Sequence, residues 1–543
     1  MALYPILILL IARYLSAEDT VVTTKYGKLR GQIVKSQNGS TIYQFLGVPF
    51  AKAPIGTLRF EKPVFPDAWS DTRDAIKFEK TCLACKKNYS PSGAEDCLYL
   101  NIWTSSYEKS SSPVLVYIHG GSYYMGSAQS MRPEAGAFYA SQGIVVVSIA
   151  YRLGHWGFLT LNDTTISPNL GLWDQNLALQ WVKENIGAFG GNNQRVTIWG
   201  DSAGAASVSQ HALSKHSTEL FHQAIQLSGS AQAAFARGTN TIASSRELIQ
   251  KVGCKTADDK KKCLQGKKVD EFFNVDGQEL ELCIIPALAY PQFSPIYDGI
   301  FFEEGAISPT DLKPTIIGFA EKEGRAFTLN NPWAPWALKV NATAPEYQKR
   351  EFMKYIKQWI TVTGYNADEK EAAEKDIFNF YAKTKNATGN QFFIEQYVRT
   401  FSDFMFNIPG IREAFTKQQA GANLYVFLLE HFRPNWPKDY PAQGSTHSDQ
   451  YPYTILCNDI KYTEDDLTVK WLLQEAFVQF VKTGNPSTDM MEWLEFDTYF
   501  SYLSLKPEPE MEAGLFLESF RFWSKKMAKY SFDFISQEPW FSP

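Results

Sequence analysis

The sequence predicts an α/β fold with a largely parallel sheet, because short apolar strands alternate with amphipathic helices along it. Near-continuous apolar runs at residues 114–118 and 144–150 are typical of strands that are buried on both faces. Apolar side chains then recur at helical spacing over residues 177–186. A further strand at 195–199 leads directly into a helix over 203–213. This alternation favours parallel pairing of the strands, with the helices packed on the sheet.

The flanking sequence extends this core on both sides. Alternating apolar and polar residues over 21–49 predict short antiparallel strands, and two more strands fit residues 315–318 and 423–428. The polar stretch from about 331 to 410 has helical character and predicts an insertion over the carboxyl edge of the sheet. Residues 469–480 predict an amphipathic helix.

Composition indicates a globular protein. The chain has 543 residues, of which 44% are hydrophobic and 20% charged, and this is too much apolar content for a disordered chain. The formal net charge is only −5, and no Lys/Arg-rich block occurs, which argues against a nucleic-acid partner. We expect a single domain over residues 18–543.

The N-terminus predicts a secretory signal peptide over residues 1–17. Its apolar run, residues 3–11, is shorter than the roughly 20 residues needed to span a membrane. Ser16 and Ala17 offer small side chains for cleavage; an uncleaved anchor is the alternative. We therefore expect a secreted protein without a transmembrane segment. Sequons for N-glycosylation fit this compartment: Asn38, Asn88, Asn162, Asn341 and Asn386.

Cysteine usage agrees with an oxidising compartment. The seven cysteines are Cys82, Cys85, Cys97, Cys254, Cys263, Cys283 and Cys457. Short loops favour a disulfide between Cys254 and Cys263, and one between Cys97 and either Cys82 or Cys85. The odd count leaves at least one thiol free or intermolecular. No second Cys pair follows at zinc spacing, so we expect no metal site.

Two motifs carry the chemistry. Gly200-Asp-Ser-Ala-Gly204 lies between a predicted strand and a predicted helix, which is the context of a nucleophile elbow that raises the hydroxyl of Ser202 above the sheet. His119-Gly-Gly-Ser122 follows the strand at 114–118, where small residues leave backbone N–H groups free to point into a cleft. The predicted oxyanion donors are the amides of Gly121, Ser122 and Ala203.

Several longer segments strengthen this interpretation. They are Phe45-Leu-Gly-Val-Pro-Phe50, Glu95-Asp-Cys-Leu-Tyr-Leu-Asn-Ile-Trp103, Tyr151-Arg-Leu-Gly154, Asn169-Leu-Gly-Leu-Trp-Asp-Gln175, Ala188-Phe-Gly-Gly-Asn192 and Gly200–Ser207. With these segments the chain resembles the type-B carboxylesterase and cholinesterase family of α/β-hydrolases over nearly its whole mature length. The resemblance implies an α/β-hydrolase fold with a helical insertion over the active site, and hydrolysis of carboxylic esters.

The resemblance also implies the partners of Ser202. The acid is a Glu directly before Gly after a short strand, which here is Glu323, and the base in the Gly-x-x-His loop is His447. Glu321 and Asp298 are rivals for the acid, and His431 is a less suitable base. The implied disulfides are Cys82–Cys97 and Cys254–Cys263. Cys85 is then an extra thiol, and partners for Cys283 and Cys457 remain open.

Departures from the family pattern bear on the substrate. Ser122 replaces a third Gly, Asp201 replaces Glu beside the nucleophile, and Gln450 stands where an acid usually follows the His. The Cys82–Cys97 loop contains no Trp, which speaks against a cholinesterase because choline-binding members place an aromatic platform there. Phe235 is a tentative acyl-pocket residue.

We therefore expect a secreted serine carboxylesterase that forms an acyl-enzyme on Ser202 and needs no cofactor. Its partners are small-molecule or lipid esters, and the oligomeric state is open. A lipase-like enzyme is the main alternative. A non-catalytic adhesion ectodomain of the same fold is the other, although such relatives usually lack a member of the triad.

Overall fold

The computed structural model describes residues 20–85, 93–108, 111–163, 165–275, 278–279, 283–285, 290–303, 312–328, 347–361, 367–382, 389–433, 442–455 and 460–539. The predicted signal peptide and Cys457 lie outside these ranges. Three of the sequons, Asn88, Asn341 and Asn386, also lie outside them. The other two, Asn38 and Asn162, are exposed on the surface.

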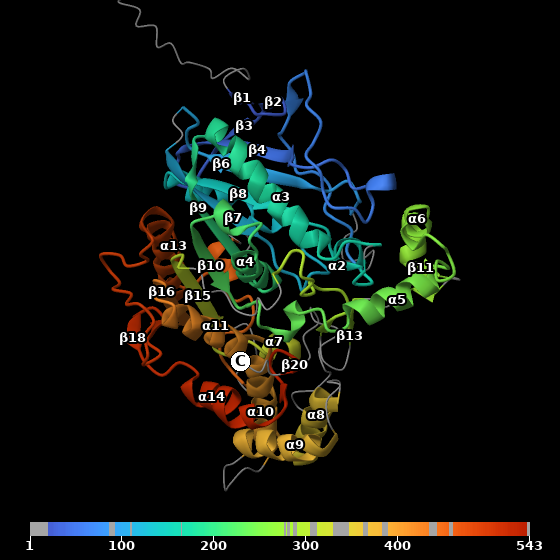
Figure 1. Cartoon of the computed structure of the whole chain (residues 1–543). Coiled ribbons are helices and arrows are strands. Elements are labelled where there is room, and N and C mark those ends of the chain that lie inside the picture. The colour runs from blue at the N-terminus through green and yellow to red at the C-terminus, as the bar shows by residue number, and fades with distance from the viewer. Residues whose placement is uncertain are drawn as a thin grey trace, which may run out of the picture.

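A mixed sheet of 11 described strands forms the centre of the molecule (Figure 1). Its order is β18-β17-β16-β15-β10-β9-β7-β8-β6-β4-β3. The strands are β3 (Gln32–Lys35), β4 (Thr41–Pro49), β6 (Tyr99–Thr104), β7 (Ser112–Ile118), β8 (Val145–Ile149), β9 (Gly191–Asp201), β10 (Gln223–Leu227), β15 (Thr315–Ala320), β16 (Leu424–Leu429), β17 (Tyr502–Leu505) and β18 (Glu510–Glu512). From β17 to β8 in this order, every neighbouring pair is parallel. At one edge β18 pairs antiparallel with β17, and at the other edge β6, β4 and β3 follow β8 in antiparallel pairs. This confirms the predicted α/β-hydrolase fold.

Two hydrophobic cores lie on opposite faces of this sheet, because successive residues of a strand point to opposite sides. In β7, Val116 belongs to one core and Tyr117 to the other, and both are fully buried. Helices α3 and α4 pack in the first core, and helices α1 and α13 pack in the second. Burial on both faces explains why β7 and β8 are almost continuously apolar.

The helices occupy the connections between strands and the insertion. They are α1 (Pro133–Ser141), α2 (Gly154–Phe158), α3 (Leu170–Asn185), α4 (Ala203–Leu213), α5 (Thr241–Lys251), α6 (Lys260–Gln265), α7 (Arg325–Thr328), α8 (Lys349–Thr361), α9 (Ala367–Tyr381), α10 (Asn390–Ser402), α11 (Ile408–Gln419), α12 (Tyr451–Thr454), α13 (Glu464–Thr483) and α14 (Leu517–Arg521). A π-helical turn, Asp403–Asn407, joins α10 to α11. Helix α13 begins with a capping box between Thr463 and Asp466 and ends at Gly484.

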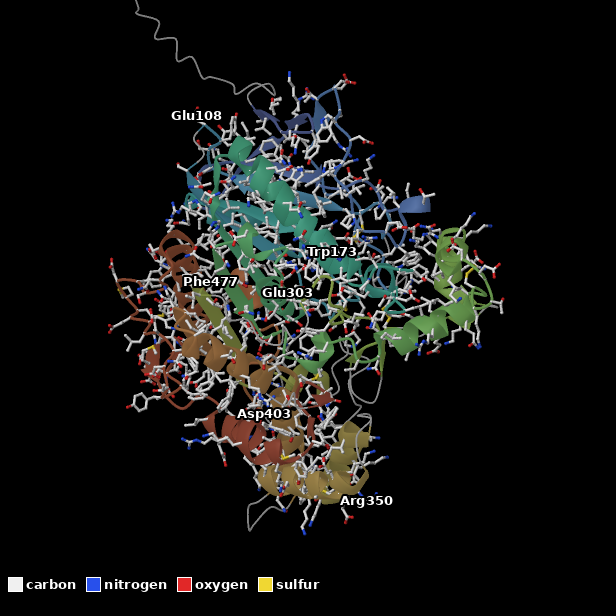
Figure 2. All side chains as sticks on the ribbon, in the orientation of Figure 1. Glu108, Trp173, Glu303, Arg350, Asp403 and Phe477 are labelled. Carbon is white, nitrogen blue, oxygen red and sulfur yellow. A yellow bond between two sulfur atoms is a disulfide. The ribbon has the colours of Figure 1, made fainter. Side chains whose placement is uncertain are left out.

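The predicted insertion is helical in its described part, where α8, α9 and α10 extend from one end of the molecule (Figures 1 and 2). The amide of Gly324, just beyond the carboxyl end of β15, donates to Ser402 Oγ at the end of α10 (2.8 Å). The insertion therefore meets the carboxyl edge of the sheet, as predicted.

Short strands outside the central sheet complete the description. They are β1 (Val21–Thr23), β2 (Lys28–Arg30) and β5 (Arg73–Asp74) in one small sheet, and the pairs β11 (Asn274–Val275) with β12 (Gln278–Glu279), β13 (Ile284–Ile285) with β14 (Tyr290–Pro291), and β19 (Phe532–Asp533) with β20 (Glu538–Pro539). No helix in the described part of the chain combines the length and apolar character that crossing a membrane requires.

Three disulfides tie the described chain together. Cys82–Cys97 and Cys254–Cys263 agree with the pairs that the resemblance implies. The expectation that Cys85 is an extra thiol is wrong, because Cys85 bonds to Cys283 across 198 residues. Both sulfurs are buried together with Tyr124, whose carbonyl accepts a hydrogen bond from the Cys85 amide (3.2 Å). Spacing could not reveal this pair, since only the fold brings the two positions together.

The Cys85–Cys283 bond predicts a stability effect. Replacing both residues by Ser should lower the free energy of unfolding by about 2–4 kcal/mol, because a cross-link over a long loop restricts the unfolded chain. Chemical denaturation of the double variant and the wild type measures the difference. An unchanged unfolding midpoint would contradict the expectation.

Candidate active site

Ser202 stands on a strained turn between β9 and α4. Its φ of +55° and ψ of −121° lie outside the regions that L-residues favour, and its amide donates to Leu227 O (2.8 Å). A Cβ on Gly200 would lie 2.2 Å from the carbonyl carbon of Gly204, and a Cβ on Gly204 would lie 2.1 Å from Ile118 O. Only glycine fits at either position. The predicted elbow geometry is therefore present, with Ser202 at the N-terminus of α4.

The turn after β7 brings backbone amides toward this elbow. Gly121 has φ +112° and Ser122 has φ +51°, and a Cβ on Gly121 would lie 2.2 Å from Met125 O. Ser122, which replaces the third Gly of the family pattern, adopts the left-handed conformation with its side chain in place. In the described chain no acceptor binds the amides of Gly121, Ser122 or Ala203. These N–H groups remain available to a ligand, as an oxyanion hole requires.

Glu323 and His447 are in direct contact. Glu323 Oε2 lies 2.7 Å from His447 Nδ1, and Glu323 is fully buried on the turn that follows β15. The other carboxylate oxygen, Oε1, accepts the amide of Ala320 (2.7 Å) and the hydroxyl of Ser228 (2.5 Å). Three donors therefore hold the carboxylate in one orientation.

Hydrogen bonds join the acid turn to the histidine loop. The amide of Lys322 donates to Ser445 O (2.8 Å), and the amide of Ala326 donates to Thr446 Oγ1 (2.9 Å). The two acceptors, Ser445 and Thr446, directly precede His447. These bonds fix the backbone of the imidazole relative to the carboxylate.

The histidine loop also contacts the elbow. Ser448 Oγ donates to Asp201 Oδ2 (3.4 Å), so the residues that follow His447 and precede Ser202 are joined. Within the described chain, Ser202 Oγ makes no hydrogen bond with His447. Catalytic hydrogen bonds are commonly long until the substrate is bound, so this geometry is compatible with a nucleophile–base pair.

Two groups at this junction have displaced pKa values. Burial lowers the pKa of His447, but the hydrogen bond and charge of Glu323, with the charges of Asp201 and Asp449, outweigh it and hold the pKa above 6.5. Burial raises the pKa of Asp201 to about 6, against the opposing effect of the His447 charge. The imidazole is therefore surrounded by carboxyl groups that stabilise its protonated form.

This electrostatic setting predicts the pH dependence. A general base must be neutral to accept a proton, so kcat/KM for a neutral ester should fall about tenfold per pH unit below the raised pKa of His447. Initial rates between about pH 5 and pH 9 measure the midpoint, which we expect above 6.5. A rate that stays flat through the acidic range would contradict His447 as the base.

Aromatic rings line one side of the imidazole. The ring centroids of Phe327 and Phe406 lie 5.0 and 4.4 Å from that of His447, and the ring of Phe235 lies 5.7 Å from Phe406. Phe406 belongs to the π-helical turn, a rare element often found at functional sites. Phe235 thus lies on an apolar wall beside the imidazole.

Sequence reasoning missed several members of this arrangement. Phe327 lies in the short helix α7, four residues after Glu323. This closeness in sequence could have suggested that Phe327 lies near the acid. Phe406 and Ser228 carried no comparable signal, because a π-helical turn and the end of a short strand leave no clear pattern. Their positions depend on tertiary structure.

The side chains of the rival residues have other partners. Glu321 pairs with Lys322 (3.0 Å), and the carboxylate of Asp298 accepts the amide of Phe301 (2.8 Å) in a structural turn. His431 Nε2 lies 2.9 Å from Asp466 Oδ1. The described residues hold no group of three His, Cys, Asp or Glu side chains suited to a metal ion.

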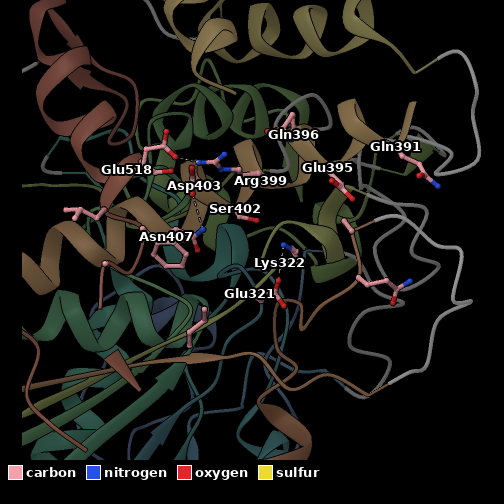
Figure 3. A pocket seen from close by; sticks show the side chains of 17 residues that line it. Glu321, Lys322, Gln391, Glu395, Gln396, Arg399, Ser402, Asp403, Asn407 and Glu518 are labelled. Atoms are coloured by element: carbon pink, nitrogen blue, oxygen red, sulfur yellow. Dashed lines mark hydrogen bonds and ion pairs between the residues drawn. The ribbon is translucent and has the colours of Figure 1, made fainter. Parts of the chain in front are cut away.

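A polar cavity of about 840 Å³ lies behind the acid turn (Figure 3). Arg399 and Glu518 form an ion pair in its wall (3.3 Å), and Asp403 lies beside them. Ser202, Glu323 and His447 are absent from its lining residues. The cavity is therefore distinct from the site around Ser202.

This fold and this arrangement are those of hydrolases with a nucleophile elbow. The chain belongs to the carboxylesterase family, whose sequence profile matches residues 18–523, and it is a carboxylic ester hydrolase. It is 32% identical over 539 residues to Gut esterase 1 of Caenorhabditis elegans, covering 95% of this chain and 94% of that protein. It is 30% identical over 536 residues to Cocaine esterase of Homo sapiens (93% and 91%), and 29% identical over 535 residues to Acylcarnitine hydrolase of Mus musculus (94% and 91%).

Proposed function

We propose that the chain is a secreted serine carboxylesterase with Ser202 as nucleophile, His447 as general base and Glu323 as the supporting acid. The observation that carries the proposal is the 2.7 Å contact between Glu323 and His447 Nδ1, next to a serine elbow. A carboxylate at Nδ1 keeps the proton there, so Nε2 is left free to accept another.

The reaction proceeds through an acyl-enzyme. His447 Nε2 takes the proton from Ser202 Oγ as that oxygen attacks the ester carbonyl, and the amides of Gly121, Ser122 and Ala203 stabilise the oxyanion. The tetrahedral intermediate collapses when His447 returns the proton to the departing alcohol. Water, activated by the same imidazole, then attacks the acyl-serine. The carboxylic acid departs, and His447 returns the proton to Ser202 Oγ.

The favoured substrates are small to medium uncharged esters. Phe235, Phe327 and Phe406 offer apolar contact beside His447, which suits an acyl chain. Lipid esters are the alternative within the same chemistry. A non-catalytic adhesion role is disfavoured by the presence of all three triad side chains.

Secretion is part of the proposal. The three disulfides fit an oxidising compartment, and Asn38 and Asn162 are exposed as glycosylation requires. The apolar segment within residues 1–17 would direct export, with removal of the peptide on entry.

A fluorophosphonate probe tests the catalytic assignment directly. It should attach to Ser202 and stop hydrolysis of p-nitrophenyl esters, because it reacts with an activated serine hydroxyl. Peptide mapping identifies the labelled residue, and an ester series of increasing acyl length separates an esterase profile from a lipase profile. Label found only on another serine would overturn the assignment.

A further inference from the structure

A chain of two hydrogen bonds leads from Gln450 to the acid of the proposed triad. Gln450 Nε2 donates to Ser228 Oγ (3.2 Å), and Ser228 Oγ donates to Glu323 Oε1 (2.5 Å). Both Gln450 and Ser228 are fully buried. Gln450 lies at the start of α12, three residues after His447, and Ser228 follows β10. Three distant segments of the chain therefore meet at one carboxylate.

The chemistry of the amide determines the direction of this chain. An amide nitrogen can only donate, so it occupies a lone pair of the Ser228 hydroxyl. That hydroxyl has a single proton, which is then directed to Glu323. A carboxylate at position 450 could only accept, and it would compete with Glu323 for the same proton.

The amide also adds no charge. The carboxyl groups that act on His447 are Glu323, Asp201 and Asp449. Two cations, Arg325 and Arg433, act on Asp449. A carboxylate at position 450 would add a fourth anion to this group, in place of a neutral donor.

We infer that Gln450 is a positioning residue. Through Ser228 it holds the Glu323 carboxylate in place to hydrogen-bond His447, and it does so without adding negative charge. The inference rests on the proposed function. The amide oxygen of Gln450 has no partner in the described chain, so the amide is held there through its nitrogen. Leaving the oxygen of a buried amide without a partner costs free energy, so the placement of Gln450 calls for an explanation, which its bond to Ser228 supplies.

A double-mutant cycle tests whether Gln450 acts through Ser228. Ser228→Ala and Gln450→Met should each lower kcat about fivefold to tenfold, with KM nearly unchanged, because each weakens a hydrogen bond that is separate from the substrate. The double variant should be no slower than Ser228→Ala alone. Thermal unfolding of each variant establishes that it is folded. Effects that multiply in the double variant would overturn the inference.

The pH profile of Gln450→Glu tests the other half of the inference, that a neutral side chain at position 450 spares His447 a further nearby anion. The new carboxylate should shift the acidic midpoint of kcat/KM upward by about half a pH unit or more, because an added anion stabilises protonated His447. Gln419→Glu, which adds the same charge at an exposed position of α11, should leave the midpoint unchanged. Equal profiles for the two variants would overturn the inference.

The same assays separate this inference from the proposed function. If Ser202→Ala retained full activity, the proposed function would fail whatever the Gln450 variants did. If Ser202→Ala were inactive while Gln450→Met and Ser228→Ala acted independently, only the role of Gln450 would fail.

Discussion

Ser202→Ala should lower kcat for p-nitrophenyl butyrate by about a millionfold, because in the proposed mechanism the Ser202 hydroxyl forms the acyl-enzyme. The residual rate should come from the amides of Gly121, Ser122 and Ala203, which can still stabilise attack by water. The turn should survive, since alanine meets the same backbone demand as serine at φ +55°. Steady-state assays at high enzyme concentration measure the loss.

The matched control is Ser531→Ala, which removes the hydroxyl of an exposed serine near the C-terminus of the described chain. It should hydrolyse the ester at the wild-type rate, and it should still react with a fluorophosphonate. Comparable rates for Ser202→Ala and Ser531→Ala would exclude Ser202 as the nucleophile.

Local sterics made the elbow predictable from the sequence. The contacts at Gly200 and Gly204 leave no room for a Cβ, so the G-x-S-x-G pattern states a geometric requirement. The strand before it and the helix after it follow from apolar periodicity. Residues within a few positions of one another thus defined the setting of Ser202 without tertiary information.

The partners of Ser202 were harder to find. Glu321 and Glu323 lie two residues apart, and periodicity does not distinguish them; the family resemblance selected Glu323. In the structure, a hydrogen bond to His447 separates them, while Glu321 pairs with Lys322. That bond spans 124 residues, so only the fold creates it.

Parts of the sheet also escaped sequence reasoning. Strand β10 contains two glutamines, which conceal a central buried strand. Gln226 is fully enclosed and donates to Glu413 Oε1 (3.0 Å), and Gln223 donates to Phe480 O (2.9 Å). Acceptors from α11 and α13 therefore pair the two amide nitrogens, which lowers the cost of burying these side chains. Such compensation comes from distant residues and leaves no local signal.

Glu323→Gln should lower kcat by about 10⁴-fold while the site keeps its shape. The amide that replaces the carboxylate can present its NH₂ group to His447 Nδ1, which must then accept the hydrogen bond. The imidazole proton would move to Nε2, where it blocks transfer from Ser202 Oγ. The loss also removes the anion that stabilises the imidazolium, so the acidic midpoint of any residual activity should fall to lower pH.

Glu321→Gln provides the matched control, because the same chemical change occurs two residues away on a side chain that pairs with Lys322. It should leave kcat within about twofold of the wild type, since surface ion pairs contribute little. Stopped-flow measurement of acylation with a p-nitrophenyl ester distinguishes the two variants at the step where the proton moves. Equal losses in both would assign the effect to the turn rather than to the carboxylate. A near-wild-type rate for Glu323→Gln would mean that the 2.7 Å contact with His447 is structural and not catalytic. Another residue would then have to be the acid of the triad.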